Sequence, residues 1–457
     1  MTDKKTKLFG TDGIRAKAGE FPLDSKTVRM IGASLARHLA ERIDGGTPVI
    51  VTGRDTRESG PWIEQELMAG ALANGASVQS AGVITTPGVA YLARVLPTNA
   101  GVVISASHNP FADNGIKIFD PSGRKLDDAT ERQIESDVAR GELVMHEASD
   151  GAHATDEQNA SNLRERYLDY LEHEIGDGLS LDELKIVVDC ANGAASEIAP
   201  KLLSDLGASV VAINNQPNGR NINLNCGSLH IEALQERVLT ERADVGVAFD
   251  GDADRALFVD AEGKFVDGDA TMWVLAGYMR SRRELHDDTV VATVMTNLGL
   301  EVALRERGIK LMRTDVGDKY VLDELLRSRA SLGGEQSGHI IFPRVSLAGD
   351  GIITALNLLR VMKNEGKSLA ELTRGFVRYP QILVNVKVRA KVPFESVPAI
   401  ANGAQEVQRD LGARGRLLLR YSGTEALARV MIEGEDEAQV RTSANTLADV
   451  IRTEIGA

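Results

Sequence analysis

The chain has 457 residues, which is more than one hydrophobic core accommodates, so we expect between two and four domains. Hydrophobic residues make up 43% of the chain and charged residues 26%, which is typical of a soluble globular protein. The net charge of −14 argues against a nucleic acid duplex or an anionic membrane surface as a partner, so an anionic substrate would need local basic residues.

The N-terminal part of the chain alternates short apolar runs with amphipathic stretches. It predicts strands at 48–53, 78–84 and 102–104, and a helix at 62–74 that Gly75 closes. This order of strands and helices is typical of a mostly parallel sheet that helices cover on both faces.

The same pattern restarts further along the chain, after a polar and charged stretch at about 141–162 that marks a domain boundary. The later predicted elements are strands at 185–190, 245–249, 290–294, 381–390, 417–419 and 428–433, helices at 194–206, 349–363 and 397–410, and a terminal helix. We therefore predict an α/β protein of four domains. Three are similar α/β domains with mixed or parallel sheets, and the last is a smaller α+β domain, with boundaries at 1–155, 156–256, 257–372 and 373–457.

The cellular compartment is predicted from the cysteines and the N-terminus. Cys190 and Cys226 do not have the spacing of metal ligands, which favours a reducing compartment. The first ten residues are polar and do not form a signal peptide. No apolar run approaches the ~20 residues that a membrane helix needs. We therefore expect a cytoplasmic protein.

Five polar loops that contain glycine or small residues lie next to apolar runs, where ligands bind in open α/β sheets. The first, GTDGIR at 10–15, has the residue composition of a tight turn, and a turn alone would explain it. Its Arg15 is a fixed cation that can bind a phosphate with two hydrogen bonds.

The second loop, SASHNP at 105–110, follows an apolar strand. A lone serine there would most simply cap a helix. Here Ser107 is followed by His108 and then by Lys117 in NGIK. A nucleophilic hydroxyl needs a partner for its proton, and a phosphoserine needs donors or cations around its charge of roughly −2. The cluster therefore favours a functional serine.

The third loop is FDGDADR at 249–255. Asp250, Asp252 and Asp254 alternate, so their carboxylates point the same way and would repel one another without a cation. Hard oxygen ligands favour Mg²⁺. A solvated acidic turn is the alternative, whereas a calcium-binding EF-hand loop would need a glutamate that is missing at the required distance.

Two further loops suit a phosphorylated sugar. In GGEQSGH at 333–339, Glu335 and Ser337 can bind sugar hydroxyls, although a polar hairpin turn would also explain them. In the segment 420–429, a capping box would predict a helix start, but the alternation that follows predicts a strand. Hydroxyls, glycine N–H groups and two guanidinium groups suit a phosphate monoester, and we assign this role to Arg420, Ser422, Gly423, Thr424 and Arg429.

Taken together, in this order and over nearly the whole chain, the five loops resemble those of the α-D-phosphohexomutase superfamily. Within it, the chain looks like the bacterial phosphoglucosamine mutase branch, on its length and on GGEQSGHII and RVMIEG. It departs from the family where Tyr421 and Ala426 replace two prolines, and where Ala253 replaces a glycine that is common in the branch.

The resemblance implies four domains around a central cleft, a phosphoserine and one Mg²⁺ per chain. It implies interconversion of glucosamine 6-phosphate and glucosamine 1-phosphate through glucosamine 1,6-bisphosphate, feeding UDP-N-acetylglucosamine and cell-wall synthesis. A phosphomannomutase/phosphoglucomutase is the alternative within catalysis, and a non-catalytic phosphosugar-binding protein is the alternative outside it. A homodimer is compatible with the resemblance.

The resemblance also implies roles for individual residues. Ser107 would transfer the phosphate and, with the three aspartates, hold Mg²⁺. Arg15 and Lys117 would lie close to the reacting oxygens, and Lys117 could act as general base and acid if its pKa were lowered. His108 would support the serine loop. The residues expected to bind the substrate are Arg255, Glu335, Ser337, His339 and the phosphate-binding set of the last loop.

Overall fold

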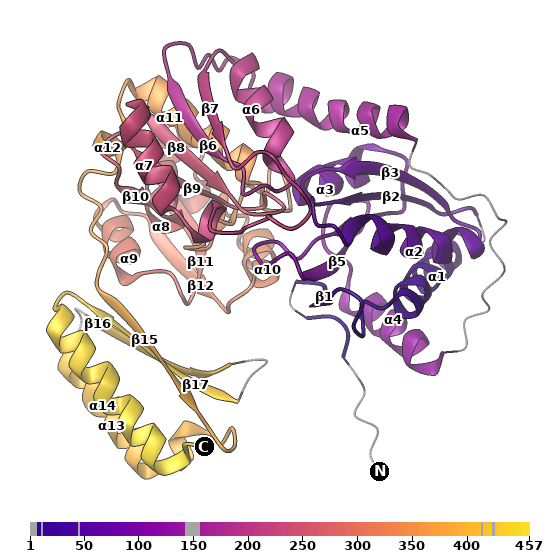
Figure 1. Ribbon diagram of the computed structural model, residues 1–457. Helices are drawn as coiled ribbons and strands as arrows, with labels where there is room; N and C mark the ends of the chain where they lie inside the picture. The colour runs from indigo at the N-terminus through magenta and orange to yellow at the C-terminus, as the bar shows by residue number, and fades with distance from the viewer. Residues whose placement is uncertain (1–6, 11, 44–45, 142–155, 413–414, 423–425) are drawn as a thin grey trace. The chain divides into compact units, whose positions relative to one another are not determined.

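The computed structural model describes residues 7–10, 12–43, 46–141, 156–412, 415–422 and 426–457 (Figure 1). The chain forms two compact units. The first contains residues 1–294 and 312–374, and the second contains residues 295–311 and 375–457. Four separate sheets lie along the chain, which agrees with the expected series of α/β domains followed by a smaller one.

The first sheet is mixed and has the order β1-β5-β4-β2-β3. Its strands are β1 (Ile14–Lys17), β2 (Val49–Arg54), β3 (Ser77–Val83), β4 (Ala100–Ile104) and β5 (Asp113–Phe119). Strands β2, β3 and β4 are parallel, as the sequence predicts, whereas β5 runs antiparallel to β4 and β1 runs antiparallel to β5. The serine loop therefore connects two adjacent antiparallel strands.

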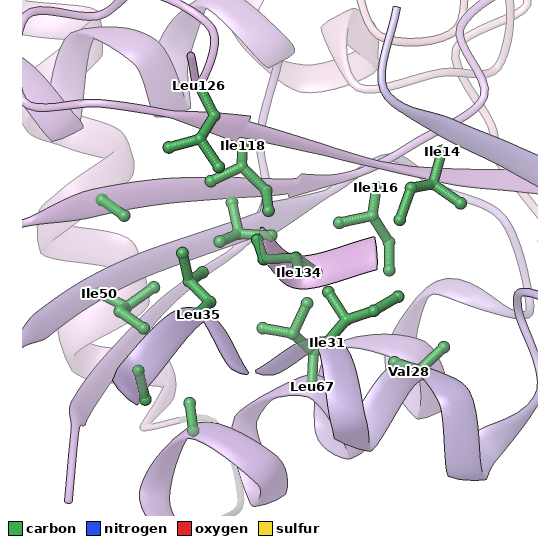
Figure 2. Close-up of a cluster of buried hydrophobic side chains, with 14 of the residues drawn as sticks. Ile14, Val28, Ile31, Leu35, Ile50, Leu67, Ile116, Ile118, Leu126 and Ile134 are labelled. Carbon is green, nitrogen blue, oxygen red and sulfur yellow. The ribbon is translucent and has the colours of Figure 1, made fainter. Parts of the chain in front are cut away.

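Helices cover both faces of this sheet. They are α1 (Ser25–Arg42), α2 (Gly60–Ala73), α3 (Thr86–Val95) and α4 (Asp128–Arg140). Figure 2 shows Ile31, Leu35, Leu67 and Ile134, from α1, α2 and α4, packed with strand residues such as Ile116 in one buried cluster. Helix α3 packs on the opposite face.

Helices α1 and α2 approach each other closely because glycines lie at their contact. A Cβ atom on Gly32 would come within 2.0 Å of the Leu67 carbonyl oxygen, and one on Gly70 within 1.9 Å of the Arg29 carbonyl oxygen. Larger residues would separate the helices and open the core beneath the sheet.

The second sheet has the order β10-β9-β8-β6-β7. Its strands are β6 (Lys185–Asp189), β7 (Ser209–Ile213), β8 (Val245–Phe249), β9 (Ala256–Asp260) and β10 (Phe265–Val266), and the helices of this region are α5 (Glu157–Asp169), α6 (Ala195–Asp205) and α7 (Glu232–Glu241). Strand β6 is parallel to both β7 and β8. Helix α5 begins inside the stretch expected to be a boundary, because Asp156 caps its N-terminus.

The third sheet has the order β12-β11-β13-β14. Its strands are β11 (Thr289–Thr293), β12 (Lys310–Thr314), β13 (Leu332–Gly334) and β14 (Ile340–Ile341), and the helices of this region are α8 (Gly268–Ser281), α10 (Asp318–Ser328), α11 (Gly351–Glu365) and α12 (Leu369–Leu372). Strands β13 and β14 are antiparallel and are joined by the loop that contains Glu335.

The second unit contains an antiparallel sheet with the order β15-β17-β16. Its elements are α9 (Leu298–Glu306), β15 (Gln381–Lys387), α13 (Pro398–Leu411), β16 (Gly415–Tyr421), β17 (Leu427–Gly434) and α14 (Glu437–Ile455). Alternate residues of β17, Ala428, Val430 and Ile432, are buried in a core shared with α13 and α14. The predicted strand at 428–433 is therefore confirmed.

Among the described residues, no helix combines the length and the apolar character needed to cross a membrane.

Candidate active site

Ser107 lies in the loop between β4 and β5, and its side chain is buried. Its backbone is left-handed, with φ of 52°. The hydroxyl Oγ donates to Asp250 Oδ2 over 2.6 Å and lies 3.3 Å from His108 Nδ1. The structure thus brings the serine loop of the first sheet against the aspartate loop that follows β8 in the second.

The three loop aspartates converge, as the alternation predicts. Asp250, Asp252 and Asp254 are buried, and each offers a carboxylate oxygen within 4.8 Å of the others. Thr86 Oγ1 and Lys117 Nζ donate to Asp252 Oδ2 over 2.6 and 2.9 Å. Within the described part of the chain, the buried Oδ1 atoms of Asp252 and Asp254 have no hydrogen-bond partner.

Burial and the neighbouring carboxylates make this cluster unfavourable for charge. Burial, together with repulsion from Asp254 and Asp252, raises the pKa of Asp250 well above its usual value. Burial also acts to raise the pKa of Asp254, but Lys117, His339 and Arg255 outweigh it and lower that pKa to about 2. Hard oxygen ligands with unsatisfied buried atoms fit a divalent cation such as Mg²⁺, with the Ser107 hydroxyl beside it.

The backbone of the aspartate loop also fits closely against the serine loop. A Cβ atom on Gly251 would lie 2.5 Å from the Ser107 carbonyl oxygen, so only glycine allows this approach. Ala253 is buried and left-handed, with φ of 57°, a conformation that glycine adopts at lower cost than alanine. Its carbonyl accepts from Gly351 N at the start of α11 over 3.0 Å.

Lys117 lies among three carboxylates. Its Nζ lies 2.9 Å from Asp252 Oδ2, 3.1 Å from Asp254 Oδ2 and 3.3 Å from Asp12 Oδ2. Burial acts to lower its pKa, but these three carboxylates outweigh burial and raise the pKa well above its usual value. Lys117 is therefore a cation when these carboxylates are charged and hold no metal ion, and its role as general base and acid stays a prediction.

Three further predicted site residues, Arg15, His108 and Arg255, lie near the serine and aspartate loops. Arg15 forms an ion pair with Asp12, a residue that was not among the predicted site residues. Burial, with the charges of Arg255 and Arg15, lowers the pKa of His108 to about 4, so its ring is neutral at neutral pH. Arg255 Nε lies 3.7 Å from Asp254 Oδ1 and 4.0 Å from Asp250 Oδ2.

The loop expected to bind the sugar adjoins the aspartate loop. Ala256 N donates to the Gly338 carbonyl over 3.2 Å. Glu335 and Ser337 are half-buried, and Ser337 Oγ donates to Glu335 Oε2 over 3.4 Å. Buried His339 lies with its Nε2 3.8 Å from Asp318 Oδ2.

Gln336 occupies the middle of this loop. Its side-chain amide donates to Asp267 Oδ2 over 3.3 Å, which joins it to the residue that caps α8.

The phosphate-binding loop belongs to the second unit. Arg420 on β16 lies opposite Arg429 on β17, and Arg429 Nη2 is 3.5 Å from Ser422 Oγ. Burial and the nearby charge of Arg429 lower the pKa of Arg420. Gly423 and Thr424 lie outside the described residues. Two facing guanidinium groups favour an anion between or beside them.

Two side chains near this loop were not expected. Lys391 Nζ donates to the Ser422 carbonyl over 2.6 Å, which adds a third cation. Tyr421, where the family has proline, stacks on Phe394 with ring centroids 4.2 Å apart and donates to the Val392 carbonyl over 2.7 Å. These contacts anchor the strand end without a proline.

Sequence reasoning also missed Thr86, Asp12 and Arg57. Arg57 lies in the polar loop DTRES, residues 55–59, that follows β2, and β2 is parallel to β4. Its position at the same edge of the sheet as Ser107 was a usable signal. Asp12 lies within GTDGIR, so the motif that contributes Arg15 also contributes this carboxylate.

Comparison with known protein families gives four matches in chain order. The matching descriptions are Phosphoglucomutase/phosphomannomutase alpha/beta/alpha domain I over residues 6–145, domain II over 165–263, domain III over 267–379 and the C-terminal domain over 383–450. These domains correspond to the expected sequence of three α/β domains and a smaller final domain.

Full-length relatives agree with the family match. A phosphoglucosamine mutase of Solibacter usitatus is 50% identical over 453 residues, which cover 98% of this chain and 99% of the relative. A phosphoglucosamine mutase of Mycobacterium ulcerans is 47% identical over 445 residues, covering 97% and 99%.

Solved structures show the same fold. A phosphoglucomutase/phosphomannomutase family protein of Burkholderia thailandensis matches with a TM-score of 0.80 and 23% identity, over 99% of both chains. An N-acetylphosphoglucosamine mutase of Aspergillus fumigatus, in complex with GlcNAc-6P and magnesium, matches with a TM-score of 0.64 and 19% identity, over 98% and 95% of the chains.

Proposed function

The chain belongs to the phosphoglucomutase/phosphomannomutase family, and from this premise we propose that it interconverts glucosamine 6-phosphate and glucosamine 1-phosphate. It is an isomerase that moves a phosphoryl group within a sugar phosphate. The amino-sugar substrate is supported by phosphoglucosamine mutase relatives at 47–50% identity over nearly the whole chain. The observation that carries the proposal is the Ser107 hydroxyl, 2.6 Å from a carboxylate of the buried aspartate cluster.

Ser107 is the phosphate carrier in this proposal. The bond between phosphorus and Ser107 Oγ breaks as the free hydroxyl of the sugar monophosphate bonds to phosphorus, and the proton of that hydroxyl ends on Oγ. The product of this half-reaction is glucosamine 1,6-bisphosphate. Return of its other phosphate to Ser107 releases the isomerised monophosphate and restores the phosphoserine.

Asp250, Asp252 and Asp254 would hold one Mg²⁺ per chain beside Ser107 Oγ. When bound, the cation offsets charge that develops on the transferring phosphoryl group. The unsatisfied Oδ1 atoms of Asp252 and Asp254 support this assignment.

Four basic residues around Ser107 have electrostatic or orienting roles in the proposal. Lys117 and Arg15 would stabilise negative charge on the reacting oxygens. Neutral His108 orients the Ser107 hydroxyl, from which its Nδ1 is 3.3 Å away. Arg255 lies beside the carboxylates and would bind phosphate oxygens.

The remaining predicted residues bind the rest of the substrate in this proposal. Glu335, Ser337 and His339 would bind sugar hydroxyls. The phosphate that is not transferring would be bound by Arg420, Ser422, Gly423, Thr424 and Arg429. Of that set, the facing guanidinium groups of Arg420 and Arg429 give the physical support.

Phosphopeptide mapping tests the carrier. We expect a substoichiometric phosphate on Ser107 in the purified protein, and at least a roughly thousandfold loss of activity in Ser107→Ala. Ser122→Ala is the matched control, because Ser122 lies on an exposed turn. A phosphate found only elsewhere, or full activity in Ser107→Ala, would contradict the proposal.

A substrate panel tests the amino-sugar preference. We expect kcat/KM for glucosamine 1-phosphate to exceed that for glucose 1-phosphate and mannose 1-phosphate. The C3 and C4 hydroxyls are common to glucose and glucosamine, so discrimination must come from groups near C2. If glucose or mannose 1-phosphate equals or exceeds glucosamine 1-phosphate, the phosphomannomutase/phosphoglucomutase alternative holds.

The cytoplasmic location and a homodimer stay predictions. Cell fractionation tests the first, and light scattering of the purified protein tests the second.

A further inference from the structure

The backbone N–H of Ser107 is held through a buried ion pair that the proposed chemistry does not use. Asp55 and Arg57 follow β2, and both side chains are fully buried. Arg57 Nε donates to Asp55 Oδ2 over 2.9 Å, and the same oxygen accepts from Ser105 Oγ over 2.6 Å. Ser105 Oγ accepts in turn from Ser107 N over 2.9 Å.

The carbonyl side of the loop is held by the rest of the Arg57 guanidinium. Nη2 donates to the carbonyl oxygens of Ser107 and Asn109 over 2.9 and 2.8 Å. Nη1 donates to the carbonyl oxygen of Asp113 over 2.9 Å and to that of Pro110. All five N–H groups of Arg57 therefore have acceptors, and four of these are carbonyls of the serine loop and the start of β5.

A second side chain reaches the same carbonyl from the second sheet domain. Asn223 Nδ2 donates to the Ser107 carbonyl over 2.8 Å and to the Asn109 carbonyl over 3.1 Å. Gly251 closes the remaining side, because a Cβ there would lie 2.5 Å from the Ser107 oxygen. Both lone pairs of the Ser107 carbonyl are thus engaged by fixed donors.

These contacts hold a backbone conformation that serine does not favour. Ser107 has φ of 52°, which costs free energy for a residue with a Cβ atom. Without donors on its carbonyl, the peptide unit would relax toward negative φ, and Oγ would leave its position 2.6 Å from Asp250.

We propose that Arg57 and Asn223 are positioning residues for phosphate transfer, because they hold the Ser107 carbonyl so that Oγ stays at the aspartate cluster. The proposal rests on the proposed function, in which Ser107 carries the phosphate. Neither residue contacts the reacting atoms. Their loss should therefore lower kcat and the rate of Ser107 phosphorylation while KM stays nearly constant.

Asn223→Asp is the sharpest variant. Aspartate keeps the size of asparagine and tolerates the left-handed backbone of this position, where φ is 57°. It replaces the amide donor by an oxygen that repels the Ser107 carbonyl. Asn225→Asp is the matched control, since Asn225 lies in the same loop with φ of 52° and is exposed.

We expect Asn223→Asp to lower kcat by about 10- to 100-fold, with KM changed less than about threefold, and Asn225→Asp to stay within about twofold of wild type. Arg57→Lys keeps the charge but has three donors in place of five, and we expect a similar loss. Intact mass after mixing with glucosamine 1,6-bisphosphate measures how fast Ser107 gains phosphate. Thermal melting measures the folded fraction.

The outcomes separate this inference from the proposed function. Asn223→Asp with kcat within twofold of Asn225→Asp overturns the inference, provided that Ser107→Ala is inactive. A loss of kcat that only follows the loss of folded protein also overturns it. If wild type gains no phosphate on Ser107, or Ser107→Ala is active, the proposed function fails first.

Discussion

Left-handed residues with side chains lie at the centre of the candidate site. Ser107 and Ala253 both have positive φ and both are buried. The Ser107 carbonyl lies against Gly251 of the aspartate loop, and the Ala253 carbonyl accepts from Gly351 N. Local strain is thus concentrated where the serine and aspartate loops meet, and the hydrogen bonds around these loops offset it.

Ala253→Gly should stabilise the protein. A left-handed alanine costs about 1–2 kcal/mol, whereas glycine adds roughly 0.5–1 kcal/mol of unfolded-chain entropy, so we expect a net gain of about 0.5–1 kcal/mol. The midpoint of thermal unfolding measures it. Ala256→Gly is the control, since Ala256 is buried in strand β9, and it should destabilise by about 1 kcal/mol. A lower midpoint for Ala253→Gly would show that the positive φ carries no cost.

Metal dependence is the second prediction at this scale. Exhaustive chelation should abolish activity, and Mg²⁺ should restore it. Asp252→Asn should raise the Mg²⁺ concentration for half-maximal activity more than about tenfold, because a charged oxygen ligand is lost. Asp260→Asn is the control, because this buried carboxylate accepts backbone N–H groups of a turn. Activity that survives chelation would refute the assignment.

At the scale of elements, the site is assembled from the ends of strands and the starts of helices. The serine loop follows β4, the aspartate loop follows β8, and α11 begins against the aspartate loop through the bond from Gly351 N to the Ala253 carbonyl. Asp350 caps α11 and also accepts from Tyr167 OH over 2.6 Å. The start of α11 therefore contacts two segments that are distant in sequence, the aspartate loop through Gly351 and α5 through Asp350.

The charge of this cap should make stability depend on pH. Burial raises the pKa of Asp350 to about 6, although its hydrogen bonds with Tyr167 and the helix N–H groups oppose the shift. Because the pKa of Asp350 is higher in the folded protein than in the unfolded chain, Asp350 contributes most to stability below its unfolded pKa. This contribution is lost as the pH rises through the folded pKa of about 6.

Asp350→Asn should remove this dependence, because asparagine caps as well without a charge. Between pH 4 and pH 7, the wild type should lose about 2 kcal/mol relative to Asp350→Asn. Unfolding of metal-free protein at several pH values measures the difference. Parallel pH curves for the two proteins would contradict the prediction.

At the scale of the whole molecule, the predicted chemistry is divided between the two compact units. Ser107, Lys117 and the aspartate loop lie in the first unit, whereas the facing arginines Arg420 and Arg429 lie in the second. Phosphate transfer and binding of the second phosphate should therefore respond separately to mutation.

Arg429→Ala should raise KM by about 10- to 100-fold, because a charge-assisted contact with the bound phosphate is lost. Mg²⁺ affinity and the phosphate content of Ser107 should stay as in the wild type. Arg441→Ala is the control, because Arg441 is exposed and forms an ion pair with Glu437 on the same helix. Unchanged kinetics in both directions would mean that the loop has a structural role alone.

The sequence by itself determined the local features of this protein. Periodicity predicted β8 at its observed bounds and β17 within a residue at each end, because burial on one or both faces of a strand leaves a local pattern. The alternation of Asp250, Asp252 and Asp254 likewise predicted a convergence that depends only on neighbours in the chain. The order of the loops predicted the family, which the domain matches confirm.

Only the tertiary structure decided which distant groups surround each of these features. The pKa of Lys117 is raised because Asp12, Asp252 and Asp254, from segments far apart in sequence, lie within 3.3 Å of its Nζ. The hydrogen bond from Arg57 to the Ser107 carbonyl likewise joins the loop that follows β2 to the loop that follows β4. Charge–charge energies depend on distance and burial, and chain folding sets both through contacts that leave no periodic trace in the sequence.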